Sequence, residues 1–266
     1  MFEDFYEFTV TPFTRSIPVK SLYRDNDRDE YIDRLKYAAK NRLFAVLFGE
    51  SGVGKTTILR RFGDEIKQNG YTVIYIADSK LTPRYFYKGI LEQLGFESKY
   101  FRGDAKRQLH KEIEIMKAVH DTSLVTICDE AHLMSHDMLE EVRFLLNTKM
   151  DSTSPMALIL SGQVGLRDNL RLQSNAAIRQ RIDIQCQVNK FDISQTAGYI
   201  KTHLAYAGCT KDIFTESAID DIFKYSCGIS RLINKACVAS LMYGSQNRKA
   251  IIDDRMVKLV IESELA

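Results

Sequence analysis

A glycine-rich stretch followed by lysine and threonine has the spacing of a phosphate-binding loop. Residues 49–56 read Gly-Glu-Ser-Gly-Val-Gly-Lys-Thr, between an apolar run at 43–48 and a helical pattern that starts near Lys55. Backbone N–H groups of such a loop, and of the helix start behind it, point at phosphate oxygens. We expect the nucleotide to be bound by Glu50, Ser51, Gly52, Val53, Gly54, Lys55, Thr56 and Thr57. Lys55 would reach the β and γ phosphates, and the Thr56 hydroxyl would bind Mg²⁺.

Two adjacent acids follow another apolar run. Residues 124–128 read Leu-Val-Thr-Ile-Cys, and Asp129 and Glu130 come next. In an α/β sheet the carboxyl ends of the strands form the edge at which ligands bind. We expect Asp129 to hold Mg²⁺ through a water molecule and Glu130 to polarise the water that attacks the γ phosphate. The pair predicts an ATPase with ATP and Mg²⁺ as cofactors.

Polar residues after a further run, and an arginine in the C-terminal part, could act on the same phosphates. Ser161-Gly-Gln163 ends the run at 156–160. A polar side chain there can hold the attacking water, and Gln163 is our first choice and Ser161 our second. Arg231 opens a C-terminal helical segment and could fold over the phosphates of its own nucleotide.

An arginine before the last apolar run could act on a neighbouring subunit. Arg181 immediately precedes the run at 182–188, and Arg179 lies two residues earlier. An arginine at the end of the preceding helix can enter another site and neutralise transition-state charge. We prefer Arg181, and either choice implies an oligomer.

Short apolar runs alternate with helix-length segments in the first two thirds of the chain. This pattern predicts an α/β fold with a mostly parallel five-stranded sheet flanked by helices, because parallel strands need crossover helices and two buried faces. The expected strands are 43–48, 72–77, 124–128, 156–160 and 182–188.

After Phe191 the strand pattern stops and a small all-helical lid is expected. Its helices would cover 194–207, 215–226, 229–243 and 253–264, with Ser194, Thr215 and Asp253 near their starts. The resulting division is an N-terminal segment, 1–40, that covers the nucleotide site, an α/β ATPase domain, 41–190, and a helical domain, 191–266. The aromatic residues near the N-terminus favour packing in a core over a cofactor site.

Composition limits the function classes. The 266 residues are 45% hydrophobic and carry a formal net charge of +2, so any DNA binding must use a local basic surface. The candidates are Lys80, Lys99, Arg102, Lys106 and Arg107, with Arg84 nearby. Five cysteines without metal spacing, no signal peptide and no apolar run of about 20 residues favour a cytoplasmic protein without a membrane partner.

Together these motifs resemble the AAA+ superfamily, and within it the ExeA-like group, which is related to the transposition ATPases TnsC and MuB. The resemblance spans nearly the whole chain. It is carried by the aromatic pattern from Phe2 to Phe13, Leu-Tyr-Arg at 22–24, the phosphate loop, Cys-Asp-Glu-Ala-His at 128–132, Ser-Gly-Gln at 161–163, Arg-Gln-Arg-Ile at 179–182 and Gly-Ile-Ser-Arg-Leu-Ile-Asn at 228–234. The resemblance implies that Gln163 is sensor 1, Arg181 the arginine finger and Arg231 sensor 2.

The same resemblance implies a ring or a helical filament with hexameric turns. The chain stops at Ala266, whereas membrane-bound ExeA-like proteins continue into a transmembrane helix. We therefore expect a regulator of DNA transposition and recombination that assembles on double-stranded target DNA and recruits or activates a transposase, with a target-selector protein as a further partner. ATP hydrolysis would control assembly or disassembly. The alternative is an ATPase that assists type II secretion or cell-envelope assembly.

Overall fold

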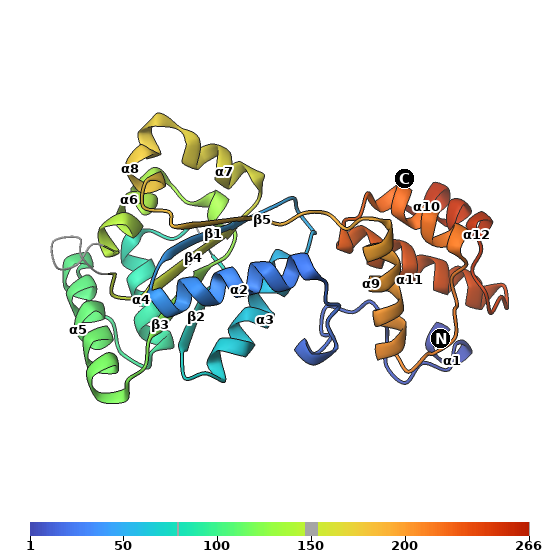
Figure 1. Cartoon of the computed structure of the whole chain (residues 1–266), viewed down its shortest axis with the longest axis horizontal. Coiled ribbons are helices and arrows are strands. Elements are labelled where there is room, and N and C mark those ends of the chain that lie inside the picture. The colour runs from blue at the N-terminus through green and yellow to red at the C-terminus, as the bar shows by residue number, and fades with distance from the viewer. Residues whose placement is uncertain (79, 147–153, 266) are drawn as a thin grey trace. The chain divides into compact units, whose positions relative to one another are not determined.

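The computed structural model describes residues 1–78, 80–146 and 154–265 (Figure 1). The chain divides into two compact units. The helical unit comprises 1–26, 51–54 and 189–266, and the α/β unit comprises 27–50 and 55–188. The expected N-terminal segment of 1–40 is therefore split between them, since its first 26 residues belong to the helical unit. Ala266, the end of the expected helical domain, lies outside the described residues.

The α/β unit is built on a sheet whose described strands have the order β2-β3-β4-β1-β5 (Figure 1). Every neighbouring pair is parallel. Each residue of β1, β3 and β4 is buried, because these apolar strands have neighbours on both sides and helices on both faces. The strands are β1 Phe44–Phe48, β2 Thr72–Ile76, β3 Leu124–Cys128, β4 Ala157–Gly162 and β5 Ile184–Gln187. The predicted parallel five-stranded sheet is confirmed, and β4 extends beyond its expected end to include Ser161.

Helices connect these strands and cover both faces of the sheet. They are α2 Asn26–Asn41, α3 Lys55–Lys67, α4 Pro83–Gln93, α5 Arg102–His120, α6 His136–Leu145, α7 Val164–Arg171 and α8 Ala176–Arg179, with 3-10 turns at Ala131–Leu133 and Gln173–Asn175. Alternation along β1 places Phe44, Val46 and Phe48 in one core with residues of α4 to α8. Ala45 and Leu47 are buried on the opposite face. All of these crossovers bring the carboxyl ends of the strands to one edge.

The helical unit has its own core, in which aromatic residues from the N-terminus take part. Its elements are α1 Phe2–Phe5, a 3-10 turn at Val19–Ser21, α9 Ile193–Tyr206, α10 Glu216–Ser226, α11 Ser230–Gln246, α12 Asp254–Val260 and a π-helical turn at Ile261–Leu265. Phe2, Tyr6 and Phe13 pack among the apolar residues of α9 to α12. The predicted packing of these aromatic residues in a core is confirmed.

The starts of α9, α10 and α12 are fixed by side-chain caps. Thr215 and Asp253 accept hydrogen bonds from the third following residue, as predicted. Ser194 is not a cap, which corrects the expected start of α9. Asp192 caps this helix in a reciprocal pair with Gln195, because its carboxylate accepts from Gln195 N and the Gln195 side chain accepts from Asp192 N. No described helix is both long and apolar enough to cross a membrane.

Candidate functional site

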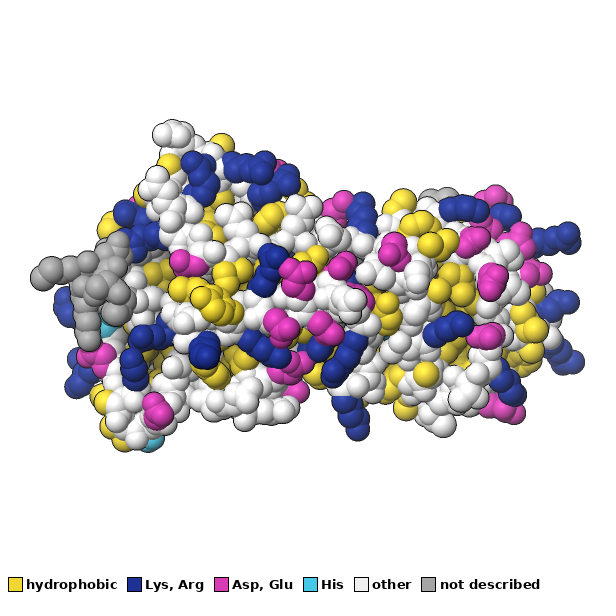
Figure 2. All heavy atoms as spheres, in the orientation of Figure 1, with side chains coloured by type: hydrophobic (Ala, Val, Ile, Leu, Met, Phe, Trp, Pro, Cys, Tyr) yellow, Lys and Arg dark blue, Asp and Glu magenta, His cyan; other side chains and the backbone are white. Residues whose placement is uncertain are grey.

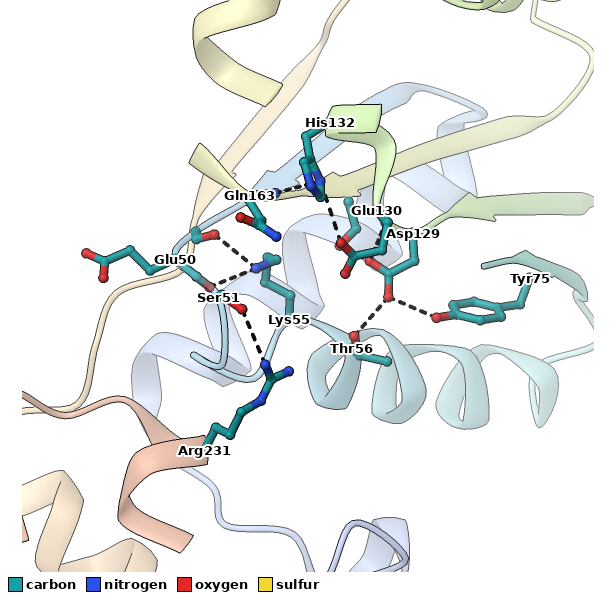
Figure 3. A network of polar contacts seen from close by, with 12 residues as sticks. Glu50, Ser51, Lys55, Thr56, Tyr75, Asp129, Glu130, His132, Gln163 and Arg231 are labelled. Atoms are coloured by element: carbon teal, nitrogen blue, oxygen red, sulfur yellow. Dashed lines mark hydrogen bonds and ion pairs between the residues drawn. The ribbon is translucent and has the colours of Figure 1, made fainter. Parts of the chain in front are cut away.

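The phosphate-binding loop joins β1 to α3, as its motif predicts. Gly52 and Gly54 have φ of +83° and +100°, a backbone region that residues other than glycine rarely adopt. The buried Lys55 donates from Nζ to the carbonyl oxygens of Gly49 at 2.9 Å and Glu50 at 2.8 Å (Figure 3). The lysine therefore lies inside the turn, at the N-terminus of α3, where α-helical N–H groups attract anions.

Asp129 lies at the carboxyl end of β3 and accepts hydrogen bonds on both of its carboxylate oxygens. Its Oδ2 accepts from Thr56 Oγ1 at 2.8 Å and from the hydroxyl of Tyr75 at 2.9 Å, and its Oδ1 accepts from Ser161 Oγ at 2.8 Å (Figure 3). The N–H of Glu130 also donates to Oδ1, at 2.9 Å. Asp129 is only 3% exposed, so these donors replace the water that its charge would otherwise require. Its orientation is fixed by α3, β2 and β4 together.

The oxygen atoms around Asp129 fit a magnesium ion. The hydroxyl of Thr56 and the carboxylate of Asp129 are hard ligands, and Mg²⁺ is usually held by one or two carboxylates together with substrate phosphates and water. Among the described residues no group of three His, Cys, Asp or Glu side chains could form an all-protein metal site. This donor set suits an ion that arrives with a nucleotide.

Glu130 follows Asp129 with a strained backbone. Its φ of +52° is left-handed, which is uncommon outside glycine and often found at functional positions. Its Oε2 lies 3.7 Å from Nδ1 of His132, and the N–H of Gln163 points to the same nitrogen at 3.4 Å (Figure 3). Glu130 and Gln163 thus approach one imidazole at the strand ends. The side chain of Glu130 is 46% exposed and can meet water.

Ser161 and Gln163 occupy different surroundings, although either could serve as the sensor. Ser161 is fully buried on β4 and its hydroxyl is bonded to Asp129. Gln163 is half-buried, and its side chain forms no cap at the start of α7.

Arg231 contacts the loop within the helical unit, to which residues 51–54 also belong. The guanidinium of Arg231 lies 3.4 Å from Ser51 Oγ, and the backbone N–H of Arg231 donates to Gly52 O at 3.1 Å. Ser230 Oγ donates to the same carbonyl at 2.7 Å. There is no room for a side chain at Gly52, because a Cβ atom there would lie 2.9 Å from Cβ of Arg231.

The two candidate finger arginines differ in their contacts. Arg179 at the end of α8 donates to the carbonyl oxygens of Leu170 at 3.4 Å and Arg171 at 2.7 Å, at the C-terminus of α7. A cation there interacts favourably with the free carbonyl groups of a helix end. Arg179 thus has a structural role in its own subunit, and Arg181 stays the preferred candidate.

The predicted DNA contacts do not form a simple basic surface. Glu141 is 5% exposed and lies 3.3 Å from both the Arg102 guanidinium and the Lys106 amino group. These two cations therefore balance a buried charge of the same unit. Arg107 pairs with Asp104, whereas Lys80 and Lys99 have exposed side chains. Basic and acidic side chains are interspersed over much of the face in Figure 2.

Several residues around the site were missed by the sequence analysis. Tyr75 looked like part of an apolar strand, and its position next to Asp129 follows only from the pairing of β2 with β3. Ser230 precedes the predicted Arg231 and had no separate signal. His132 was part of a quoted motif without an assigned role, and its contact with the N–H of Gln163 links two segments distant in sequence.

Comparisons with known proteins agree with this geometry. The family model for an AAA domain matches residues 38–170, half of the chain. General secretion pathway protein A of Aeromonas hydrophila is 28% identical over 246 residues, which cover 91% of this chain. The chain spans 44% of the length of that relative. The similarity supports the resemblance to the ExeA-like group.

Two solved structures share the fold at low sequence identity. Cdc6p from Pyrobaculum aerophilum is 17% identical with a TM-score of 0.72, over 94% of this chain and 69% of that one. The ORC1 protein of Aeropyrum pernix, in complex with DNA, is 15% identical with a TM-score of 0.65, over 92% of this chain and 67% of that one. With the family match and the loop, acidic pair and parallel sheet described above, the chain belongs to the AAA domain family and is an AAA+ ATPase.

Proposed function

We propose that the residues around Asp129 hydrolyse ATP with the help of Mg²⁺. The loop N–H groups and Lys55 bind the phosphates, and Thr56 and Asp129 hold the metal ion, which neutralises phosphate charge when bound. Glu130 orients and polarises the attacking water. Gln163 senses the γ phosphate as sensor 1, since Ser161 is already bonded to Asp129. Arg231, which contacts Ser51 of the loop, acts as sensor 2.

We propose further that Arg181 completes the site of a neighbouring subunit. Arg179 donates to the carbonyl groups of α7 in its own subunit, and Arg181 is the finger that we prefer. A finger in trans makes hydrolysis depend on a ring or helical filament with hexameric turns. Nucleotide binding and assembly would then stabilise each other.

The cellular role that we propose is regulation of DNA transposition. The chain would assemble in the ATP state on double-stranded target DNA and recruit or activate a transposase, with a target-selector protein as partner, and hydrolysis would control assembly or disassembly. The observation that carries the DNA part is the fold shared with the ORC1 protein in complex with DNA. The resemblance to TnsC and MuB supports the transposase part. The free thiols of all five cysteines favour the reducing cytoplasm.

Lys80 and Lys99 are the better candidates for contacts with DNA phosphates. Both lysines are exposed, whereas Arg102 and Lys106 form ion pairs with the buried Glu141. Several subunits in one assembly would add such weak contacts together.

Cosedimentation with duplex DNA at low salt tests this role. We expect DNA to pellet with the protein in ATP or a non-hydrolysable analogue and not in ADP, and Lys80→Ala with Lys99→Ala to reduce the pelleted fraction more than Lys67→Ala. Equal pelleting in ATP, in ADP and without nucleotide, or none in any of them, would contradict the proposal.

A second function is favoured by the similarity to General secretion pathway protein A. In that case the ATPase would assist type II secretion or cell-envelope assembly. It predicts that DNA leaves both the ATPase rate and the oligomeric state unchanged. A rise of the ATPase rate with duplex DNA, lost at high salt, would decide for the transposition role.

A further inference from the structure

Tyr75 lies on the edge strand β2, and its hydroxyl is bonded to the same oxygen of Asp129 as Thr56. The two donor atoms lie 2.9 and 2.8 Å from Oδ2 (Figure 3). The pairing of Ile76 with Cys128 aligns the ends of β2 and β3, so a tyrosine one residue before the end of β2 can reach Asp129. Tyr75 thus closes one side of the carboxylate, opposite the bonds to Ser161 and Glu130 N.

The backbone of Tyr75 is held in place from outside the sheet. β2 is the edge strand of the described sheet, and the main-chain N–H and C=O of Tyr75 face away from β3. On that side the side-chain amide of Gln93, at the end of α4, takes the place of a further strand. Its Oε1 accepts from Tyr75 N at 3.2 Å, and its Nε2 donates to Tyr75 O at 3.0 Å. These two hydrogen bonds fix the backbone of Tyr75 and therefore the position of its hydroxyl relative to Asp129.

The phenol remains a hydrogen-bond donor at all physiological pH values. A tyrosine hydroxyl has an ordinary pKa of about 10 and is protonated at neutral pH. Tyr75 is 40% exposed, so it contributes little to the core. A residue that served only to pack β2 would not need its hydroxyl on a buried carboxylate.

We propose that Tyr75 is a positioning residue for the metal-binding carboxylate of Asp129. With Thr56 it holds Oδ2 in one orientation, so the metal ion meets a preformed ligand when it arrives with the nucleotide. Partners of metal ligands commonly change metal affinity about 10- to 100-fold when they are removed. The inference rests on the proposed role of Asp129 in metal binding.

The test is a titration of the protein–ADP complex with Mn²⁺, followed by the electron paramagnetic resonance signal of the free ion. We expect Tyr75→Phe to weaken Mn²⁺ binding about tenfold, and to leave ADP affinity in EDTA and the melting temperature near those of the wild type. Tyr85→Phe, which removes a hydroxyl from an exposed tyrosine on α4, should match the wild type.

Two results would overturn the inference. One is Mn²⁺ affinity that is unchanged or higher in Tyr75→Phe, and the other is an equal loss of ADP affinity in EDTA, which would mean a structural role. Asp129→Asn separates this from the proposed function. If Asp129→Asn binds Mn²⁺ as the wild type does, the role of Asp129 itself is wrong. If only Asp129→Asn loses the metal, the role of Asp129 stands and that of Tyr75 does not.

Discussion

The buried carboxylate of Asp129 accepts hydrogen bonds from residues of several segments of the chain. A carboxylate can accept several hydrogen bonds, and Thr56, Tyr75, Ser161 and Glu130 N all donate to Asp129. A buried charge without such donors would cost several kcal/mol. The need to satisfy Asp129 and the need to orient a metal ligand are therefore met by the same hydrogen bonds.

Lys55 is the residue on which nucleotide binding should depend most. Its amino group lies on the carbonyl oxygens inside the loop, close to where phosphate groups would bind. Hydrogen bonds to charged groups are worth about 1.5–3 kcal/mol each, so we expect Lys55→Ala to weaken ATP binding at least about tenfold. Isothermal calorimetry measures this directly. Lys67→Ala, at the other end of α3, is the control and should bind as the wild type does.

At the scale of elements, the N-terminal segment is held to α9 through His203. The N–H of Phe13 donates to His203 Nδ1 at 3.2 Å, and the two rings stack with centroids 5.1 Å apart. Burial lowers the pKa of His203 from 6.5 to about 4. Between these pH values the unfolded chain binds a proton that the folded chain excludes.

The helical unit should therefore lose stability in acid. The contribution of neutral His203 is complete above pH 6.5 and falls by about 3 kcal/mol as the pH approaches 4. Asn in place of His keeps an acceptor for Phe13 N–H and cannot titrate. We expect urea unfolding to show a smaller decrease between pH 7 and pH 5 for His203→Asn than for the wild type. The same decrease in both proteins would mean that His203 does not titrate as a buried group.

The order and type of the elements could be read from the sequence, because a fully buried parallel strand is apolar along its whole length. The cap at Asp192 was also available, since Asp-Ile-Ser-Gln at 192–195 has the spacing of a reciprocal cap. Contacts between distant segments were not available. The ion pairs of Arg102 and Lys106 with Glu141 gave no signal, because Glu141 lies 35 or more residues away in sequence.

The sequence also predicted part of the candidate site. Motif spacing brought out the loop and the acidic pair, which need particular residue types at fixed positions. Tyr75 gave no signal, because a tyrosine suits an apolar strand whether or not its hydroxyl has a partner. The contact of Arg179 with the α7 carbonyl groups could not be read from the sequence, because it depends on how α7 and α8 pack.

At the scale of the whole molecule, a finger in trans makes two inactive variants complementary. Lys55→Ala subunits lack a working loop but carry Arg181, and Arg181→Ala subunits have the reverse defect. We expect Arg181→Ala alone to keep ATP binding and lose hydrolysis, and mixtures of the two variants to regain part of the ATPase rate. Phosphate release at several mixing ratios measures this. No recovery at any ratio would argue against a shared site, and Arg179→Ala mixtures provide the comparison.

Assembly that is controlled by ATP turnover depends on hydrolysis by Glu130. The most direct measurement is the steady-state rate of phosphate release at saturating Mg²⁺ and ATP for the wild type and Glu130→Gln. A general base contributes about 10²–10⁴-fold, so we predict that the rate falls at least about 100-fold while ATP binding is retained and the ATP-bound oligomer accumulates. Glu114→Gln, on the exposed side of α5, should leave the rate unchanged. Equal rates for the wild type and Glu130→Gln would show that Glu130 does not activate the attacking water.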